Sequence, residues 1–399
     1  MAERRLETRI SRRRFVRGVA LGAAALSMPG SLLVRGGDAS AQTSDALHRR
    51  IRAELSTFTD WLGRNGVKGY IGEVGWPDNY RGDASEWNEL AGTWYDAADA
   101  AKLWVTQWST GEWWGTTYKL ALYEDRRSPA GVDSANTQAV VTEAHPTTPS
   151  YLRGVNVSGA EFGAPYSLDP TSNFSNRRPG RYNYAYHYDG QATFDYLARR
   201  GIKLIRLQFR WERIQPVLGG ALDETELRRL KAAVGRAADA GLKVILDVHN
   251  FGDYYIEEDG RGVRYAIGSQ RLPIRHFVDL WRRLSSKFKG TPGIVGYGLM
   301  NEPAGMPRVG DLSPARVWER ASQKALDAIR SGGDRRVVLV QGYEWAGAQR
   351  WATNHPASWI DDPENNFRYE AHHYWDRDNS GAYSHSYAEE VADARKRGY

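Results

Sequence analysis

From Tyr151 onward, short apolar runs such as KVILDV (243–248) alternate with segments of helical periodicity, and few architectures accommodate that order. Repeated alternation of strand and helix is typical of a parallel sheet covered by helices. The last helix opens with Ser386 and Glu389 at the spacing of a capping box. We expect strands over 152–157, 203–209, 243–248, 294–300, 336–341 and 367–374, and helices over 192–200, 223–240, 274–289, 314–330 and from Ser386 onward.

Two further units of the same kind come before residue 125. We expect a helix over 45–62, a strand over 68–74, a helix over 94–101 and a strand over 103–108. Residues 125–150, which contain SPAG and HPTTPS, form the best candidate for a linker. Six strands after it and two before it make the eight that close a (β/α)8 barrel. The competing architecture, an open doubly wound sheet, needs a glycine-rich phosphate turn, and SGAEFG (158–163) lacks that spacing.

Polar side chains mark the ends of the expected strands. In a parallel barrel the carboxyl ends of all strands meet on one face, where active sites form. An apolar strand that ends in Asn301 and Glu302 is hard to explain by packing, because burying a carboxylate is unfavourable. The candidate site residues are Glu73, Trp108, Arg206, His249, Asn301, Glu302, His372 and Tyr374.

Two glutamates among aromatic rings indicate a retaining glycosidase. One carboxyl group protonates the leaving oxygen while the other attacks the anomeric carbon, which requires a separation of about 5–5.5 Å. A neighbouring Asn can bind the sugar 2-hydroxyl, and Trp108 can stack on a sugar ring. Arg206 and His249 can hold one carboxylate in its ionised form. Glu112 and Glu161, in Gly-rich loops, are further candidates for substrate contacts.

The histidines do not predict a metal site. His249 and the pair His372–His373 lack ligand spacing of the HxxxH type, and no nearby carboxylate pattern completes a site. The chain has no cysteine, which excludes thiolate metal sites and disulfide-stapled folds. We therefore expect neither a metal nor another cofactor.

Seven segments of the sequence resemble glycoside hydrolase family 5, of the cellulase type. They are GYIGEVG (69–75), TQWSTGEWWG (106–115), RGVNVSGAEFG (153–163), IRLQFRWERIQP (205–216), VILDVHN (244–250), YGLMNEP (297–303) and YEAHHYWD (369–376). The resemblance extends over nearly the whole chain after residue 41 and implies that Glu302 is the acid/base and Glu73 the nucleophile. It also implies that Asn301 binds the 2-hydroxyl and that Trp108 is the stacking platform. The supporting polar shell that it implies consists of Arg206, His249, His372 and Tyr374.

The order of these segments departs from the family. In the family the acid/base precedes the nucleophile, whereas here Glu73 lies 229 positions before Glu302. We interpret this order as a circular permutation, in which strands seven and eight (42–124) precede strands one to six (151–399) and residues 125–150 join the original ends. A fusion of fragments from two hydrolases is the alternative, and an export signal directly before residue 42 argues against it.

Residues 1–41 have the pattern of a bacterial twin-arginine (Tat) signal peptide. Arg12 to Arg14 precede a weakly apolar run, and Ala39-Ser40-Ala41 resembles a cleavage site. As a membrane helix, the run is short, Gly-rich and interrupted by Pro29. The segment holds eight of the 54 basic and three of the 48 acidic residues, so that 46 basic and 45 acidic residues remain. The net charge of +6 therefore belongs mostly to the signal and does not indicate nucleic-acid binding.

The sequence thus predicts a secreted, monomeric endo-β-1,4-glucanase that acts on polysaccharide, with a single glycosidase barrel over 42–399. Its 15 tryptophans and 22 tyrosines fit a protein whose rings stack on sugars. Mannan, xyloglucan or another β-glucan is an alternative substrate, because loop residues decide that preference. A carbohydrate-binding barrel without turnover is the alternative from a different class. We expect no nucleic-acid partner and no membrane attachment of the mature chain.

Overall fold

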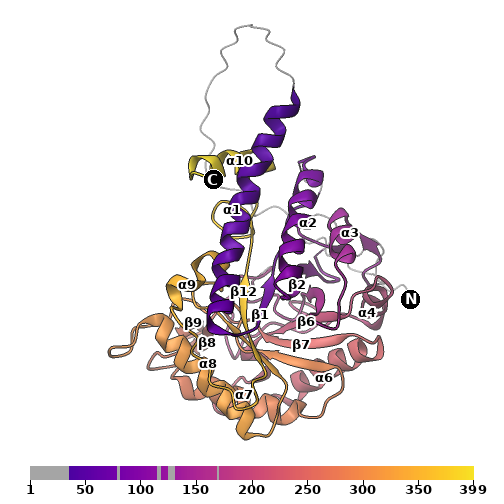
Figure 1. Ribbon diagram of the computed structural model, residues 1–399. Coiled ribbons are helices and arrows are strands. Elements are labelled where there is room, and N and C mark those ends of the chain that lie inside the picture. The colour runs from indigo at the N-terminus through magenta and orange to yellow at the C-terminus, as the bar shows by residue number, and fades with distance from the viewer. Residues whose placement is uncertain (1–35, 79–80, 115–117, 125–130, 169) are drawn as a thin grey trace, which may run out of the picture. The chain divides into compact units, whose positions relative to one another are not determined.

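The computed structural model describes residues 36–399, apart from 79–80, 115–117, 125–130 and 169 (Figure 1). Contacts within the chain separate the residues up to Ser40 from one compact unit, Ala41–Tyr399. Most of the predicted signal peptide, 1–41, therefore lies outside the described residues. The first helix, α1 (Gly36–Asn65), begins before the predicted start at residue 45.

Eight parallel strands form a closed barrel, as the sequence predicts. Each strand pairs with the next one along the chain, and β1 pairs with both β2 and β12, so that the ring has no open edge. The register places Tyr70 of β1 beside Trp104 of β2 and Glu370 of β12. The barrel strands are β1 (Gly69–Glu73), β2 (Trp104–Thr110), β5 (Arg153–Val157), β6 (Leu204–Phe209), β7 (Lys243–Val248), β10 (Ile294–Gly298), β11 (Val337–Gln341) and β12 (Phe367–His372).

Helices cover the outside of the barrel (Figure 1). Helix α6 (Glu224–Asp239) shows why they form. Asp223 caps it by accepting a hydrogen bond from the Glu226 amide at 2.8 Å, and one face buries Leu227, Leu230 and Val234. Ser386 and Glu389 form the predicted capping box at the last helix. The remaining helices are α2 (Ala84–Ala100), α3 (Thr137–Ala144), α4 (Gln191–Arg199), α5 (Trp211–Ile214), α6 (Glu224–Asp239), α7 (Ile274–Phe288), α8 (Pro314–Ser331), the 3-10 turn η1 (Ala348–Arg350), α9 (Trp351–Asn354) and α10 (Tyr387–Lys396).

Two segments are more regular than the sequence predicts. Helix α2 begins at Ala84 and not near residue 94, because Trp87, Leu90 and Trp94 form one buried face. The segment 125–150, predicted to be the least structured, contains α3, where Thr142 Oγ1 donates to the buried Gln107 Oε1. A short antiparallel pair, β3 (Tyr123–Glu124) and β4 (Ser134–Ala135), lies just before α3.

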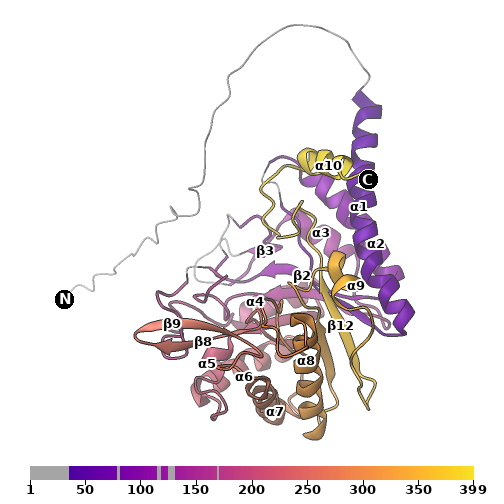
Figure 2. The same ribbon diagram turned by 90° about the vertical axis from the view of Figure 1, so that its left-hand side faces the viewer.

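A hairpin that the sequence reading missed projects from the side of the barrel (Figure 2). It consists of β8 (Asp253–Glu258) and β9 (Arg261–Ala266), which pair in antiparallel register. Asp259 and Gly260 form the turn with φ of 48° and 77°. Asp-Gly with positive φ at both positions is the strongest short-range signal of a hairpin.

The first and last barrel strands are joined by side chains as well as by backbone pairing. Trp76 and Trp375, which follow β1 and β12, stack with ring centroids 5.3 Å apart. Arg50 of α1 is 1% exposed and donates to the carbonyl oxygens of Trp375 and Asp376, and its Nη1 lies 3.9 Å from Glu390 of α10. These contacts tie α1 to the segment after β12 and to α10.

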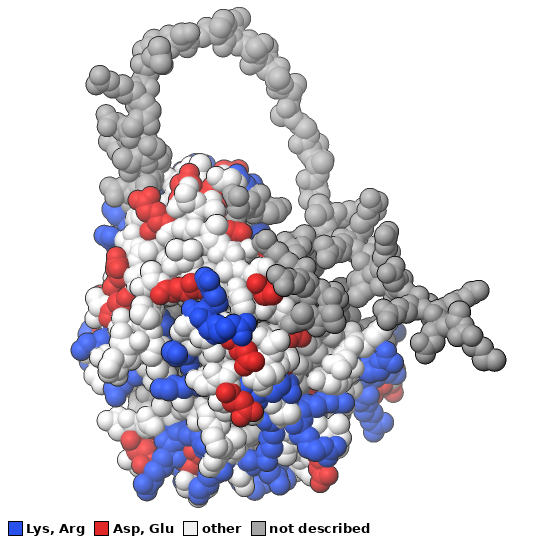
Figure 3. Space-filling model, turned by 90° about the vertical axis from the view of Figure 1, so that its right-hand side faces the viewer, with Lys and Arg blue, Asp and Glu red and all other residues white. Residues whose placement is uncertain are grey.

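The described surface has a mixed charge. On the face shown in Figure 3, acidic and basic side chains are interspersed among uncharged ones. This distribution agrees with the near balance of 46 basic and 45 acidic residues after residue 41. In the part of the chain that the structure describes, no helix combines the length and apolar character needed to cross a membrane.

Candidate active site

The predicted site residues meet at the carboxyl ends of the barrel strands. One cavity is lined by aromatic rings and by predicted site residues, while Arg206 lies buried inside the barrel. A hollow of about 550 Å³ between α7 and α8 contains none of the predicted site residues. The cavity with the predicted residues is lined by Glu73, Trp108, His249, Asn301, Glu302 and Tyr374, and by the rings of Trp114, Tyr118, Phe162, Tyr166 and Phe251.

Arg206 of β6 is the centre of the buried polar network. Its Nη1 donates to Glu73 Oε1 at 2.9 Å. Its Nη2 donates to Asp247 Oδ1 at 2.9 Å and to Asn301 Oδ1 at 2.6 Å. Burial lowers the pKa of the guanidinium, but the carboxylates of Asp247, Glu370 and Glu73 raise it above its ordinary value. Arg206 is therefore a fixed positive charge beneath the cavity.

Glu73, the last residue of β1, is held in its ionised form. Its Oε1 accepts from Arg206, and its Oε2 accepts from the Tyr374 hydroxyl at 2.8 Å. Burial raises the pKa of this carboxyl, but the charges of His372 and Arg206 outweigh burial and bring the pKa below its ordinary value.

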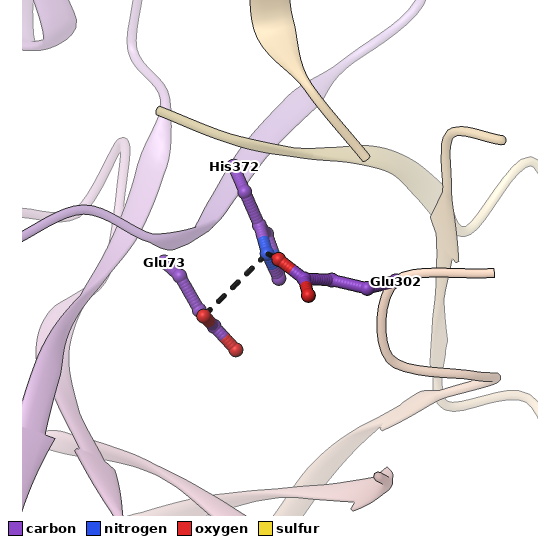
Figure 4. Close-up of side chains that lie close together, drawn as sticks. All are labelled: Glu73, Glu302 and His372. Carbon is purple, nitrogen blue, oxygen red and sulfur yellow. Dashed lines mark hydrogen bonds and ion pairs between the residues drawn. The ribbon is translucent and has the colours of Figure 1, made fainter. Parts of the chain in front are cut away.

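Glu302, which follows β10, faces Glu73 across His372 (Figure 4). His372 Nδ1 donates to Glu302 Oε1 at 2.8 Å and lies 3.6 Å from Glu73 Oε2. One ligand atom from each of the three side chains lies within 4.8 Å of the other two. The backbone of Glu302 has φ of 45°, in the left-handed region that L-residues rarely adopt and that is often found at functional sites.

The two glutamates have opposite tendencies to hold a proton. Burial raises the pKa of Glu302, and the neighbouring Glu73 charge raises it further, against the hydrogen bond from His372. Burial lowers the pKa of His372, but Glu73, Glu302 and Glu370 raise it to about 10. The site therefore holds His372 charged at neutral pH and favours a proton on Glu302 over one on Glu73.

His249 fixes Asn301 in a defined orientation. Burial holds the pKa of His249 well below its ordinary value, so that the ring is neutral. Its Nδ1 donates to Asp247 Oδ2 at 3.0 Å, which leaves Nε2 to accept from Asn301 Nδ2 at 3.2 Å. Because Asn301 Oδ1 accepts from Arg206, both ends of the amide are assigned by their partners.

Trp108 forms one wall of the cavity. Its Nε1 donates to the Tyr118 hydroxyl at 2.7 Å, and its ring lies nearly parallel to His249, with centroids 5.8 Å apart. Trp114 meets Trp108 edge to face at 6.1 Å. Tyr118 was not predicted as a site residue, and its only sequence signal is its place in the Trp-rich loop.

Glu370 of β12 is the main functional residue that the sequence reading missed. It is fully buried, with Oε1 3.2 Å from Arg206 Nη2 and 3.4 Å from His372 Nε2, and its Oε2 accepts from Gln341 Nε2 at 2.5 Å. The period of two along β12 could have found it, because Glu370, His372 and Tyr374 alternate along the chain.

The two further carboxylates proposed as substrate contacts have different surroundings. Glu161 lines the cavity, its Oε2 accepts from the Gly159 amide at 2.8 Å, and burial raises its pKa to about 7. Glu112 is not among the residues that line the cavity, and its Oε1 accepts from the Gly190 amide and the Thr193 hydroxyl at 2.7 Å each.

Comparison with known proteins places the chain in a family. The model of the family Cellulase (glycosyl hydrolase family 5) matches residues 156–397. A probable endo-beta-1,4-glucanase B of Neosartorya fischeri is 31% identical over 231 residues, which cover 57% of this chain and 61% of that protein. Endoglucanase 1 of Robillarda sp. is 30% identical over 247 residues, covering 58% and 61%. The crystal structure of Pseudomonas stutzeri endoglucanase Cel5A is 35% identical with a TM-score of 0.50, covering 63% and 75%.

The matched region leaves out the first part of the barrel. The chain spans about three fifths of the length of the curated relatives it matches. The family model begins within β5 and ends just after the last helix, so that β1 with Glu73 and β2 with Trp108 lie before it. The matched residues amount to more than half of the sequence. They include Glu302, which lines the cavity, and the buried Arg206 and His372. The chain belongs to glycosyl hydrolase family 5, the cellulase family.

Proposed function

We propose that this chain is a retaining endo-β-1,4-glucanase that cleaves cellulose-type chains by double displacement. The observation that carries the proposal is the spacing of its two facing glutamates: one oxygen of Glu73 and one of Glu302 lie within 4.8 Å of each other. Retaining glycosidases place these groups about 5–5.5 Å apart, whereas inverting enzymes need about 6.5–9.5 Å to admit water. The relatives named as endoglucanases support the substrate class.

Glu302 is the acid of the first step. Because its Oε1 accepts a hydrogen bond from His372, the proton of the neutral carboxyl group is on Oε2. That proton passes to the glycosidic oxygen, and the carbon–oxygen bond breaks with its electron pair on the leaving oxygen. An oxygen of the ionised Glu73 attacks the anomeric carbon and forms a glycosyl ester. The raised pKa of Glu302 and the lowered pKa of Glu73 suit these roles.

The same pair completes the second step. The ester removes the negative charge of Glu73, which is one cause of the raised pKa of Glu302, so the pKa of Glu302 falls. Glu302, now a carboxylate, takes a proton from water as the water oxygen attacks the anomeric carbon. The bond to Glu73 breaks with its electron pair on the carboxylate, and the sugar leaves with its original anomeric configuration.

The surrounding residues have supporting roles in this proposal. Asn301 binds the sugar 2-hydroxyl, because its amide is already oriented by Arg206 and His249. Tyr374 holds Glu73 Oε2, and Trp108 offers a ring on the cavity wall on which a sugar can stack. His372 orients Glu302 and carries the positive charge between the two carboxyl groups.

We further propose that the barrel is circularly permuted relative to its family, with residues 125–150 joining the original ends. Two observations support this: the family model starts only at residue 156, and the barrel strands β1 and β2 close the ring between β12 and β5. A test is a reordered chain that begins at Tyr151 and connects Tyr399 to residue 42 through a flexible linker. Activity in this chain supports the permutation. A reordered chain that fails to fold, together with a wild-type chain whose residues 42–124 unfold separately, supports a fusion of fragments.

The export expectation completes the proposal. Residues 1–41 act as a Tat signal, and residues 42–399 form the secreted, monomeric single-barrel enzyme. Replacement of Arg12 and Arg13 by Lys should retain the enzyme in the cytoplasm of a Tat-competent host, while the same chain without residues 1–41 remains active after purification.

The stereochemistry of the product tests the reaction. We expect proton NMR of fresh cellohexaose digests to show the β-anomer first, whereas an initial α-anomer refutes the double displacement. Glu73→Gln and Glu302→Gln should each reduce kcat by several orders of magnitude. Glu302→Ala should still release dinitrophenol from dinitrophenyl cellobioside, because that leaving group needs no proton, and azide should restore its second step. Glu73→Ala should do neither.

A panel of polysaccharides tests the substrate. We expect reducing ends to appear fastest on carboxymethylcellulose, with a rapid fall in viscosity that marks cleavage within chains. Faster release from mannan, xyloglucan or a β-1,3-glucan transfers the assignment to that polymer and leaves the catalytic pair unchanged. Binding of cellohexaose without any product identifies a carbohydrate-binding barrel and refutes the enzyme.

A further inference from the structure

A second cluster of ionisable side chains lies outside the catalytic cavity. Glu112 follows β2, while His187 and Asp189 come just before α4. His187 is 3% exposed, Asp189 is 1% exposed and Glu112 is half-buried. One nitrogen or oxygen from each side chain lies within 4.8 Å of the other two. The three residues are therefore close enough to share one bound ion.

The contacts of His187 are short but are not hydrogen bonds. Its Nε2 lies 2.7 Å from Asp189 Oδ1 and 3.6 Å from Glu112 Oε2. Yet among the described residues neither ring nitrogen of His187 has a hydrogen-bond partner, and neither does Asp189 Oδ2. A contact of 2.7 Å without hydrogen-bond alignment means that Nε2 is directed past the carboxylate oxygen. Side chains that converge on a common ion make unaligned contacts of this kind.

The catalytic cluster provides the contrast. Glu73, Glu302 and His372 lie as close together as the three residues of the second cluster. There, however, His372 Nδ1 donates an aligned hydrogen bond to Glu302 at 2.8 Å. That nitrogen is occupied by a proton and is not available as a metal ligand, because a coordinating His must be neutral.

The charge of the second cluster is not balanced by protein groups. Two carboxylates and one imidazole sum to −1 with a charged ring and to −2 with a neutral one. Among the described ion pairs, His187 is the only basic partner of Glu112 and of Asp189. Burial and the Asp189 charge raise the pKa of Glu112, as expected of carboxylates that lack a full counter-charge. A divalent cation with a neutral imidazole brings the sum to zero.

The protein holds these side chains in place without an ion. Glu112 Oε1 accepts from the Gly190 amide and the Thr193 hydroxyl, which leaves Oε2 facing His187. The His187 ring stacks on Trp113 with centroids 4.1 Å apart. Supporting hydrogen bonds and packing of this kind orient the ligands of metal sites.

We propose that Glu112, His187 and Asp189 bind one divalent transition-metal ion, such as Zn²⁺, with water completing its coordination. Imidazole and carboxylate ligands together suit this class of ion. The ion joins the loop after β2 to the segment before α4. Because Trp114 of that loop lines the catalytic cavity, the ion also fixes one wall of the cavity. No sequence spacing announces the site, since Glu112 lies far along the chain from His187.

Metal analysis of the purified chain tests the proposal. After dialysis against EDTA and then against ZnCl₂ and buffer, we expect about one equivalent of zinc by mass spectrometry and a higher Tm than that of the metal-free protein. His187→Gln should lose the bound zinc and the rise in Tm. Glu112→Gln, at a half-buried position, should weaken zinc binding at least tenfold by calorimetry, and it decides the outcome if His187→Gln does not fold.

Glu302→Gln is the matched control, since it disrupts the catalytic cluster and should bind zinc as the wild type does. Co²⁺ substitution should give visible absorption bands that disappear in Glu112→Gln and persist in Glu302→Gln. The proposal is refuted if the wild type retains no stoichiometric metal, or if zinc is lost in Glu302→Gln and kept in Glu112→Gln. If His187→Gln lowers the Tm by the same amount with and without zinc, His187 forms only an ion pair with the two carboxylates.

Discussion

Replacing Glu370 by Gln removes one of the three carboxylates that face His372 and keeps the size of the side chain. Glu370 Oε1 lies 3.4 Å from His372 Nε2, inside a fully buried network. At such a distance and an effective dielectric constant of about 20, the interaction amounts to about 5 kcal/mol, which corresponds to a change of about 3.5 in pKa. The pKa of His372, now about 10, should therefore fall to about 6–7 in the variant.

Because of this lower pKa, His372 of the variant should lose its proton within the pH range in which the enzyme works. Above that pH, His372 loses its positive charge and no longer lowers the pKa of Glu73. The proton that it loses is the one on Nε2, the nitrogen that faces residue 370. We expect kcat/KM of Glu370→Gln to decline from about pH 7 upward, at a lower pH than in the wild type. The assay is the pH profile on a soluble cellodextrin, combined with nitrogen-15 NMR of the histidine rings.

Glu86→Gln on the exposed surface of α2 is the matched control, and its profile should follow that of the wild type. The reasoning is refuted if the profiles of Glu370→Gln and the wild type coincide while NMR still shows a charged His372 at pH 8. A general loss of activity at every pH, with an unchanged profile shape, would assign Glu370 a purely structural role.

Three further predictions follow from the same structure. The pH profile of the wild type should be bell-shaped. Activity rises with pH as Glu73 ionises at its lowered pKa, and it falls as Glu302 loses its proton at its raised pKa. A profile without the alkaline limb, or one whose alkaline limb persists in Glu302→Gln, contradicts the acid assignment. The pKa of Glu161 is raised to about 7 in the folded protein, so the protein loses stability as pH rises from the unfolded pKa of this carboxyl group to its folded pKa. Glu161→Gln should therefore stabilise the protein relative to the wild type by up to about 3 kcal/mol at pH 8 and not at pH 4, measured by urea unfolding. Arg50→Ala leaves buried carbonyl and carboxylate groups without their cation and should lower the free energy of unfolding by about 3–5 kcal/mol. Arg52 is exposed, and Arg52→Ala should lower it by less than about 0.5 kcal/mol. Equal effects would show that the buried contacts contribute little.

The barrel and the position of most candidate residues at or just after a strand end could be predicted from the sequence, because both depend on local pattern, whereas Arg206 lies within β6. Alternation of strand and helix gives the architecture, and polar residues such as Glu73 and Glu302 stand out after apolar runs. Glu370 did not stand out, because it lies within a strand, where its burial depends on Arg206 from a distant part of the chain. The β8–β9 hairpin does carry a local signal, the turn sequence Asp259-Gly260, although no strand was expected on either side of it.

The spacing of the catalytic pair and the charge state of each member could not be predicted in the same way. The pKa values of Glu302 and His372 depend on burial and on neighbours that only the closed barrel brings together. The grouping of Glu112 with His187 is equally non-local, since the two residues meet only because β2 and β5 are neighbours in the ring. Distances of this kind become visible only in three dimensions.

The pairing of β1 with β12 also bears on how the protein folds. Gly69 lies opposite Tyr369, so the ring closes through a contact between residues about 300 positions apart, and contacts of such high order slow folding. A chain under synthesis can make the helices up to α9 and the β5–β11 strand pairs before β12 exists, yet Glu73 cannot meet His372 until that strand has emerged. Turnover of substrate therefore reports closure of the ring itself. During refolding, recovery of activity should lag behind recovery of helical circular dichroism by the time that closure takes.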